Sequence, residues 1–198
     1  VVIVIFIAFL TLFLVKGRLR NGLLAGIILS LLLSWGKNLS FLTQFFIDYF
    51  PLYNKFRAVS SIQVILEFCF PVLACLGLYR LFQKPEKLEA SKILKPTAAF
   101  VMALLILIFS KGFLDFSGAM DSYLRDAYGS ILMDQIVVAR KTIFNYDLIR
   151  AVLYCLVIGA LLYYFTQGKL SKKITLAALI ALMMSDLIGV SQRYIDRE

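Results

Sequence analysis

Two closely spaced cations stand out in residues 51–61, which read PLYNKFRAVSS between two strongly apolar runs. Lys55 and Arg57 flank Phe56, so an extended or turning backbone can direct both charges to one side while the phenyl ring enters lipid. Arginine offers a planar fork and lysine a mobile point charge, a pair that suits a phosphate or pyrophosphate group. The alternative is that both cations simply reach up to lipid headgroups, as isolated interfacial lysines and arginines do.

Three charged residues lie inside other apolar runs, where hydrocarbon would reject an unpartnered charge. Glu67 lies seven residues beyond Ser60, about two helical turns into its run. Arg150 and Asp186 lie near the same predicted end of two later runs. We predict that these three are buried polar residues and that Glu67 contacts Arg150, directly or through water, with Asp186 as the rival partner. Whether they clamp helices together or take part in catalysis is left open by their positions.

Metal and cofactor chemistry finds no support in the remaining polar residues. The chain has no histidine, and its three cysteines lack metal-ligand spacing, so they are interpreted as small apolar residues. No Walker loop, nucleophile elbow or GxGxxG motif is present, so no cofactor and no metal are predicted. Asp121 and Arg125 have the i, i+4 spacing of a weak surface ion pair on a helix. The cysteines are Cys69, Cys75 and Cys155.

Composition places the chain among polytopic membrane proteins. Of its 198 residues 61% are hydrophobic and 17% charged, and the mean hydropathy is +0.86. The net charge of +9 comes from short clusters between apolar runs and not from one basic face, which argues against nucleic-acid binding. We therefore predict an all-α, integral membrane helical bundle that forms a single domain over residues 1–198.

About six membrane-spanning helices are predicted. The run at 1–15 would rise about 22 Å as a helix, short of the roughly 30 Å hydrocarbon core, so we expect it to be incomplete and the chain to be a piece of a longer polypeptide. Pro71 is expected to kink the third run. The six runs are 1–15, 21–36, 60–81, 93 or 97 to 109, 148–165 and 174–190.

Two segments between these runs are predicted to be amphipathic helices at the membrane surface. Residues 39–50 are rich in aromatic side chains but are interrupted by Gln44 and Asp48. Residues 110–147 form the longest stretch that does not span, and apolar residues recur in its first half at helical spacing. Gly129 is expected to break that helix.

Basic residues predict which side of the membrane each loop faces. Loops 16–21, 80–96 and 166–173 contain eleven lysines and arginines in 31 positions, whereas loops 36–59 and 110–147 contain seven in 62. Because cytoplasmic loops are enriched in such residues, the long loops are predicted to be extracytoplasmic.

Two stretches resemble a known family. The run FIDYFPLYNKFRAVSSIQVILEFCFPVLA resembles the YfhO family of large bacterial membrane proteins, in which a proline, an aromatic residue and NKFR precede a small-residue turn and a membrane span. The ending SDLIGVSQRYIDRE looks like the exit of that family's last central span. The resemblance covers about residues 35–82 and 185–198, and the rest agrees in topology alone.

YfhO-like proteins are similar to GT-C glycosyltransferases, which transfer a sugar from a polyprenyl phosphate outside the bacterial cytoplasmic membrane. The resemblance implies that Lys55 and Arg57 contact the carrier phosphate, with Tyr53 and Asn54 as supporting donors. It also implies that the catalytic acidic residue lies in an earlier loop that this chain lacks, so the catalytic residue is unknown. The expected partners are the lipid bilayer, the polyprenyl-phosphate sugar donor and the rest of the same polypeptide.

The leading hypothesis is therefore that the chain is part of a GT-C-like glycosyltransferase. Whether the chain itself is an enzyme is left open. The first alternative is a lipid-handling or transport protein in which Glu67, Arg150 and Asp186 line a polar path. The second is a scaffold for other membrane proteins.

Overall fold

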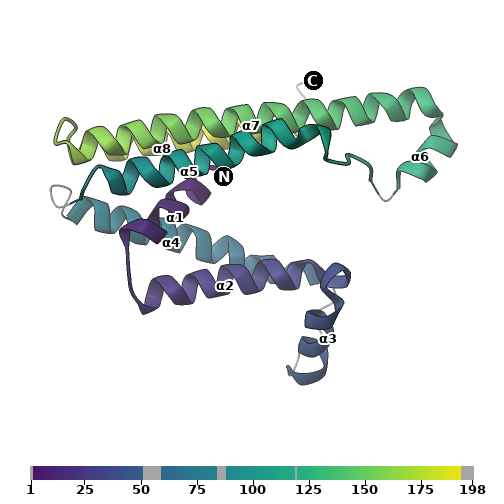
Figure 1. The fold of residues 1–198 in the computed structure, drawn as a ribbon, viewed down its shortest axis with the longest axis horizontal. Coiled ribbons are helices and arrows are strands. Elements are labelled where there is room, and N and C mark those ends of the chain that lie inside the picture. The colour runs from purple at the N-terminus through teal and green to yellow at the C-terminus, as the bar shows by residue number, and fades with distance from the viewer. Residues whose placement is uncertain (1, 51–58, 84–87, 119, 193–198) are drawn as a thin grey trace.

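The protein is an all-α bundle (Figure 1). The computed structural model describes residues 2–50, 59–83, 88–118 and 120–192, and every regular element within these ranges is helical. The elements in order are α1 (Val2–Leu14), α2 (Arg18–Ser34), the 3-10 turn η1 (Gly36–Leu39), α3 (Ser40–Tyr49), η3 (Val59–Ile62), α4 (Gln63–Gln83), α5 (Ser91–Phe109), η5 (Ser110–Gly112), α6 (Asp121–Tyr128), α7 (Ser130–Thr166) and α8 (Lys172–Ser191).

Helix α1 occupies the centre of the bundle. It packs against α4, α5, α7 and α8, while α2 packs on the outer side of α4. Figure 1 shows α1 enclosed between α4 and the layer formed by α5, α7 and α8. Phe6 and Leu10 are fully buried there, and Phe6 lies 5.4 Å from Phe100 of α5, measured between ring centroids. The core of the protein is therefore built around its first helix.

Among the described residues, four helices are long and apolar enough to cross a membrane, namely α4, α5 with its 3-10 extension, α7 and α8. In each of them most of the apolar window is not buried within the chain, as expected of a surface that faces lipid. Helices α1 and α2 have 13 and 17 residues, about 20 and 26 Å of helix, which is less than the roughly 30 Å core. All six predicted runs are thus helical, and four of them have the dimensions of a complete span.

Helix α7 is much longer than the sequence patterns predicted. The expected fifth span began at Leu148, but the helix starts at Ser130 and runs without interruption for 37 residues, about 55 Å. The predicted break is confirmed at Gly129, whose φ of 85° separates α6 from α7. Since 55 Å exceeds the thickness of the hydrocarbon core, the first part of α7 projects beyond the other spans, toward α6 (Figure 1).

Helix α3, Ser40–Tyr49, confirms a helix within the predicted range 39–50, and none of its residues is buried. Phe41 and Tyr49 are strongly exposed, and the rings of Phe46 and Phe50 stack 4.5 Å apart. Pro71 lies inside α4, which continues on both sides of it as one helix from Gln63 to Gln83.

Two glycines let helices approach closely. A Cβ atom built on Gly77 of α4 would overlap the hydroxyl of Thr11 in α1, and one built on Gly159 of α7 would lie 2.6 Å from Cγ2 of Thr97 in α5. Both threonine hydroxyls donate to the carbonyl four residues earlier, on Ile7 and Ile93, so they are satisfied within their own helices. Small residues at such crossings are the usual way for membrane helices to pack without a hydrophobic driving force.

Candidate functional site

The polar groups inside the bundle gather near one of its ends. The links 14–18 and 166–172, the end of α4 and the start of α5 lie at one end, which we call the basic end (Figure 1). The starts of α4 and α7, the C-terminal part of α8 and helix α6 lie toward the other, which we call the α6 end (Figure 1). Glu67, Arg150 and Asp186 all belong to the half nearer the α6 end, as the sequence predicted.

The central feature of the site is an ion pair between α7 and α8. Nη2 of Arg150 donates to Oδ1 of Asp186 over 2.9 Å. The Asp186 side chain is 1% exposed and that of Arg150 16%. A buried carboxylate in a membrane bundle requires such a partner, because the cost of removing an isolated charge from water is several kcal/mol or more. The rival pairing considered from the sequence is therefore the one that forms.

Tyr154 and Ser185 extend this ion pair into a cluster of four polar residues. The Tyr154 hydroxyl lies 2.7 Å from the Ser185 hydroxyl, which also lies 3.1 Å from the carbonyl oxygen of Leu182 and can donate to it. The sequence patterns did not identify either residue as part of the site. Their spacing could have indicated them, since Tyr154 follows Arg150 by one helical turn and Ser185 precedes Asp186 directly.

A groove of about 430 Å³, which we call the α7–α8 groove, lies beside this cluster. Nε of Arg150 is buried and has no hydrogen-bond partner, although a guanidinium carries five N–H donors. Gly189 keeps the groove open there, because a Cβ atom at this position would lie 3.4 Å from Nη1 of Arg150. The groove is therefore lined by the Arg150 guanidinium and by the hydroxyl pair of Tyr154 and Ser185. Its lining includes Tyr146, Arg150, Tyr154, Ser185, Gly189 and Gln192.

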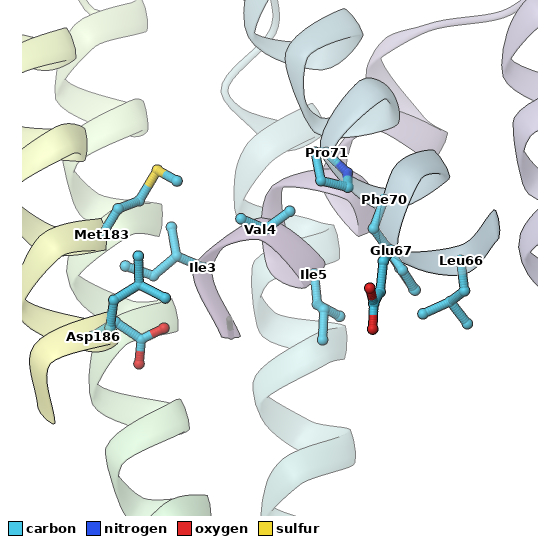
Figure 2. Close-up of a pocket in the computed structure, with 10 residues that line it drawn as sticks. Ile3, Val4, Ile5, Leu66, Glu67, Phe70, Pro71, Met183 and Asp186 are labelled. Atoms are coloured by element: carbon cyan, nitrogen blue, oxygen red, sulfur yellow. The ribbon is translucent and has the colours of Figure 1, made fainter. Parts of the chain in front are cut away.

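A second cavity, of about 250 Å³ and almost entirely apolar, lies where α4, α1 and α8 meet (Figure 2). Figure 2 shows the carboxylates of Glu67 and Asp186 on opposite sides of the start of α1. The other lining residues are Ile3, Val4, Ile5, Leu66, Phe70, Pro71, Met183 and Leu187.

The prediction that Glu67 contacts Arg150 does not hold in this arrangement. Arg150 pairs with Asp186, and the ion pairs among the described residues include none of Glu67. Glu67 is also exposed on the surface of the chain, and not buried as predicted. The physical reason is that α1 lies between α4 and α8, which leaves Arg150 next to the acid of its own neighbouring helix.

The predicted phosphate contacts Tyr53, Asn54, Lys55 and Arg57 lie outside the described residues. Within the described ranges no group of three or more histidine, cysteine, aspartate or glutamate side chains could hold a metal ion. Cys69 and Cys155 are buried as free thiols and Cys75 is exposed, so none of the three is in a disulfide.

A second ion pair fastens α6 to the projecting part of α7. Arg140 donates to both carboxylate oxygens of Asp121, over 2.6 and 2.9 Å, and to the carbonyl of Phe116 over 3.0 Å. The backbone N–H of Gly118 donates to the same carboxylate. The partner of Asp121 is thus Arg140 and not the predicted Arg125, because the turn at Gly129 folds α6 back toward α7.

We expect the Asp121–Arg140 pair to hold α6 in place in a pH-dependent way. Hydrogen bonds from Arg140, then from Gly118, lower the pKa of Asp121 below its ordinary value of 3.8. Because the pKa is lowered in the folded state, the stabilisation is complete above that ordinary value and is lost as the pH falls through the lowered one. Asp121→Asn should therefore accelerate amide hydrogen exchange in α6 several-fold at pH 7.

The matched control for that variant is Asp126→Asn, in the same helix and without a described ion pair. It should leave exchange in α6 near the wild-type rate. Equal exchange in all three proteins at pH 7 would show that the ion pair does not hold the helix.

No protein-family model, no curated protein and no solved structure matches this chain. The function of this chain is therefore inferred from the geometry of the α7–α8 groove and from the residues in and around it.

Proposed function

We propose that this chain is the membrane-embedded part of a glycosyltransferase that uses a sugar linked to a polyprenyl phosphate, and that the α7–α8 groove receives the carrier phosphate. The observation that carries the proposal is Arg150, which lines the groove beside the Tyr154–Ser185 hydroxyl pair and is held there by Asp186. A guanidinium fork is the side chain best suited to phosphate oxygens.

The chemistry proposed for the groove is electrostatic stabilisation of the departing lipid phosphate. Asp186 holds the guanidinium in place through Nη2, and Nη1, beside Gly189 in the groove lining, is the donor proposed for the ligand. The hydroxyl pair of Tyr154 and Ser185 lies one helical turn away, and it supplies one neutral donor, the Tyr154 hydroxyl, when Ser185 donates to Tyr154. Donors fixed before charge develops need no reorganisation during the reaction, which is why such sites lower barriers effectively.

The cationic segment before α4 completes the proposed donor site. In this proposal Lys55 and Arg57 contact the outer phosphate oxygens, and Tyr53 and Asn54 support them, as the resemblance to YfhO-like proteins implies. The α6 end then faces the extracytoplasmic side of a bacterial cytoplasmic membrane, in agreement with the density of basic residues in the short loops at the other end.

A second candidate function is lipid handling without catalysis. The apolar cavity between α1, α4 and α8 favours it, because a cavity with almost no polar lining suits a hydrocarbon chain. The two functions differ in whether a sugar is transferred after the lipid binds.

The binding step is tested with a photoreactive polyprenyl phosphate added to the complete protein in phosphatidylcholine vesicles. Arg150→Lys keeps a cation beside Asp186 but removes the fork, so crosslinking to α7 and α8 should weaken about tenfold, a loss of ~1.4 kcal/mol. The control Arg125→Lys, on exposed α6, should crosslink like the wild type. Equal crosslinking of all three proteins would remove Arg150 from the site.

The transfer step is tested in the same proteins by following sugar release from the lipid-linked donors of native membranes. Arg57→Ala should abolish transfer while leaving membrane insertion normal, and Arg57→Lys should restore it only in part. Lipid crosslinking that depends on Arg150 together with no transfer by the wild type would favour the lipid-handling function.

A further inference from the structure

Glu67 is an acid that has no ion pair among the described residues. It lies on α4 at the edge of the apolar cavity, and the ion pairs of the described residues do not include it. The neighbouring side chains of Val64 and Phe68 on the same helix are strongly exposed and apolar, as expected of a surface that faces lipid. A carboxylate in such surroundings is costly unless a cation meets it.

The depth of Glu67 restricts the source of that cation. It is the fifth residue of α4, so it lies about 6 Å along the helix axis from Gln63. The headgroup regions of a bilayer add roughly 5–8 Å to each side of the hydrocarbon core. Glu67 is therefore within reach of lipid headgroups, and a cationic group attached to a lipid can meet it without leaving the membrane.

The adjoining cavity can hold the apolar part of the same molecule. Its volume of about 250 Å³ exceeds the ~150 Å³ of an engineered apolar cavity that binds benzene. The other carboxylate in its lining, Asp186, already pairs with Arg150 across the α7–α8 interface. Figure 2 shows Glu67 on the side of the cavity away from Asp186, beside Leu66 and Phe70. One acid thus has a partner within the bundle, and among the described residues no cation occupies the other.

We propose that Glu67 and this cavity form a binding site for a membrane lipid with a primary ammonium headgroup. The ammonium donates to the Glu67 carboxylate, and part of one alkyl chain enters the cavity beside Val4 and Phe70. Charge complementarity selects the lipid class, since an anionic headgroup would be repelled and a quaternary ammonium has no N–H to donate. The site is separate from the α7–α8 groove and does not depend on the proposed transferase activity.

The site is tested by native mass spectrometry of the complete protein from nanodiscs that contain equal amounts of phosphatidylethanolamine and phosphatidylcholine. Wild-type protein should retain phosphatidylethanolamine about tenfold over phosphatidylcholine after partial delipidation. Glu67→Gln keeps the shape of the side chain but removes its charge, and it should bring that ratio close to one.

Two further variants separate the charge from the cavity. Glu89→Gln changes an exposed acid at the basic end, where the carboxylate accepts a hydrogen bond from Ser91, and should retain the wild-type ratio. Val4→Trp fills the cavity and should reduce total bound lipid while Glu67 is intact. Equal retention of the two lipids by the wild type, or an unchanged ratio in Glu67→Gln, would overturn the proposal.

Discussion

Replacing Arg150 with methionine is expected to lower the free energy of unfolding by about 3–5 kcal/mol, which places it among the most damaging single changes in the bundle. The reason is that Asp186 is 1% exposed and would lose the guanidinium that lies 2.9 Å away. Asp186→Leu should be similarly damaging, because it strands the cation in its place. Both effects are measurable as changes in unfolding of the complete protein in detergent micelles.

The double variant Arg150→Met with Asp186→Leu distinguishes a broken ion pair from a general packing defect. With neither charge present, its stability should return to within about 1–2 kcal/mol of the wild type, since well-packed apolar residues often replace a buried pair without loss. Arg125→Met on exposed α6 should change stability by no more than about 0.5 kcal/mol. Losses that simply add in the double variant would contradict the coupling.

Gly77→Ala is the second change expected to be strongly destabilising, by about 3 kcal/mol. The new Cβ atom would overlap the Thr11 hydroxyl, and Thr11 is fully buried at the crossing of α1 and α4. Thr11 cannot move aside easily, because its β-branched side chain is held by a hydrogen bond to the carbonyl of Ile7. The same unfolding measurement in micelles would detect the loss.

Two companion variants show whether the overlap is the cause. Thr11→Ala removes the atom that is overlapped and should recover part of the stability when combined with Gly77→Ala. Gly22→Ala in α2 places a methyl group where no atom lies within 4 Å, so it should be neutral or stabilising by up to about 1 kcal/mol. Equal stability of Gly77→Ala and the wild type would show that the helices can separate without cost.

The helices of the bundle were largely predictable because the apolar runs are long and their breaks are marked by glycine or by charge. The start of α7 was the main error. Residues 130–147 contain Asp134, Arg140 and Asp147, so their lower hydropathy assigned them to a stretch that does not span and placed the start of the fifth span at Leu148. Neither glycine nor proline occurs between Gly129 and Gly159, so nothing in the backbone chemistry ends the helix there. A change in hydropathy marks the edge of the membrane and not the end of a helix.

The polar pairs were only partly predictable, because pairing depends on which helices are neighbours. The position of each residue within its apolar run identified Glu67 and Asp186 as the acids available to Arg150. It could not show that α1 separates α4 from α8 (Figure 2). The partner of Asp121 was missed for a related reason. Local spacing favoured Arg125, whereas Arg140 is brought near by the turn at Gly129.

The central position of α1 also sets an order on assembly during synthesis. Roughly 160 residues separate α1 from α8, and at about 5–20 residues per second the ribosome needs some 10–30 s to add them. During that interval the side of α1 that carries Phe6 and Leu10 must remain in lipid without its final partners. It can do so because Thr11, the polar residue among its buried side chains, already bonds to Ile7 of the same helix. Helix α1, which is made before α8, can therefore remain in the membrane until α8 packs against it.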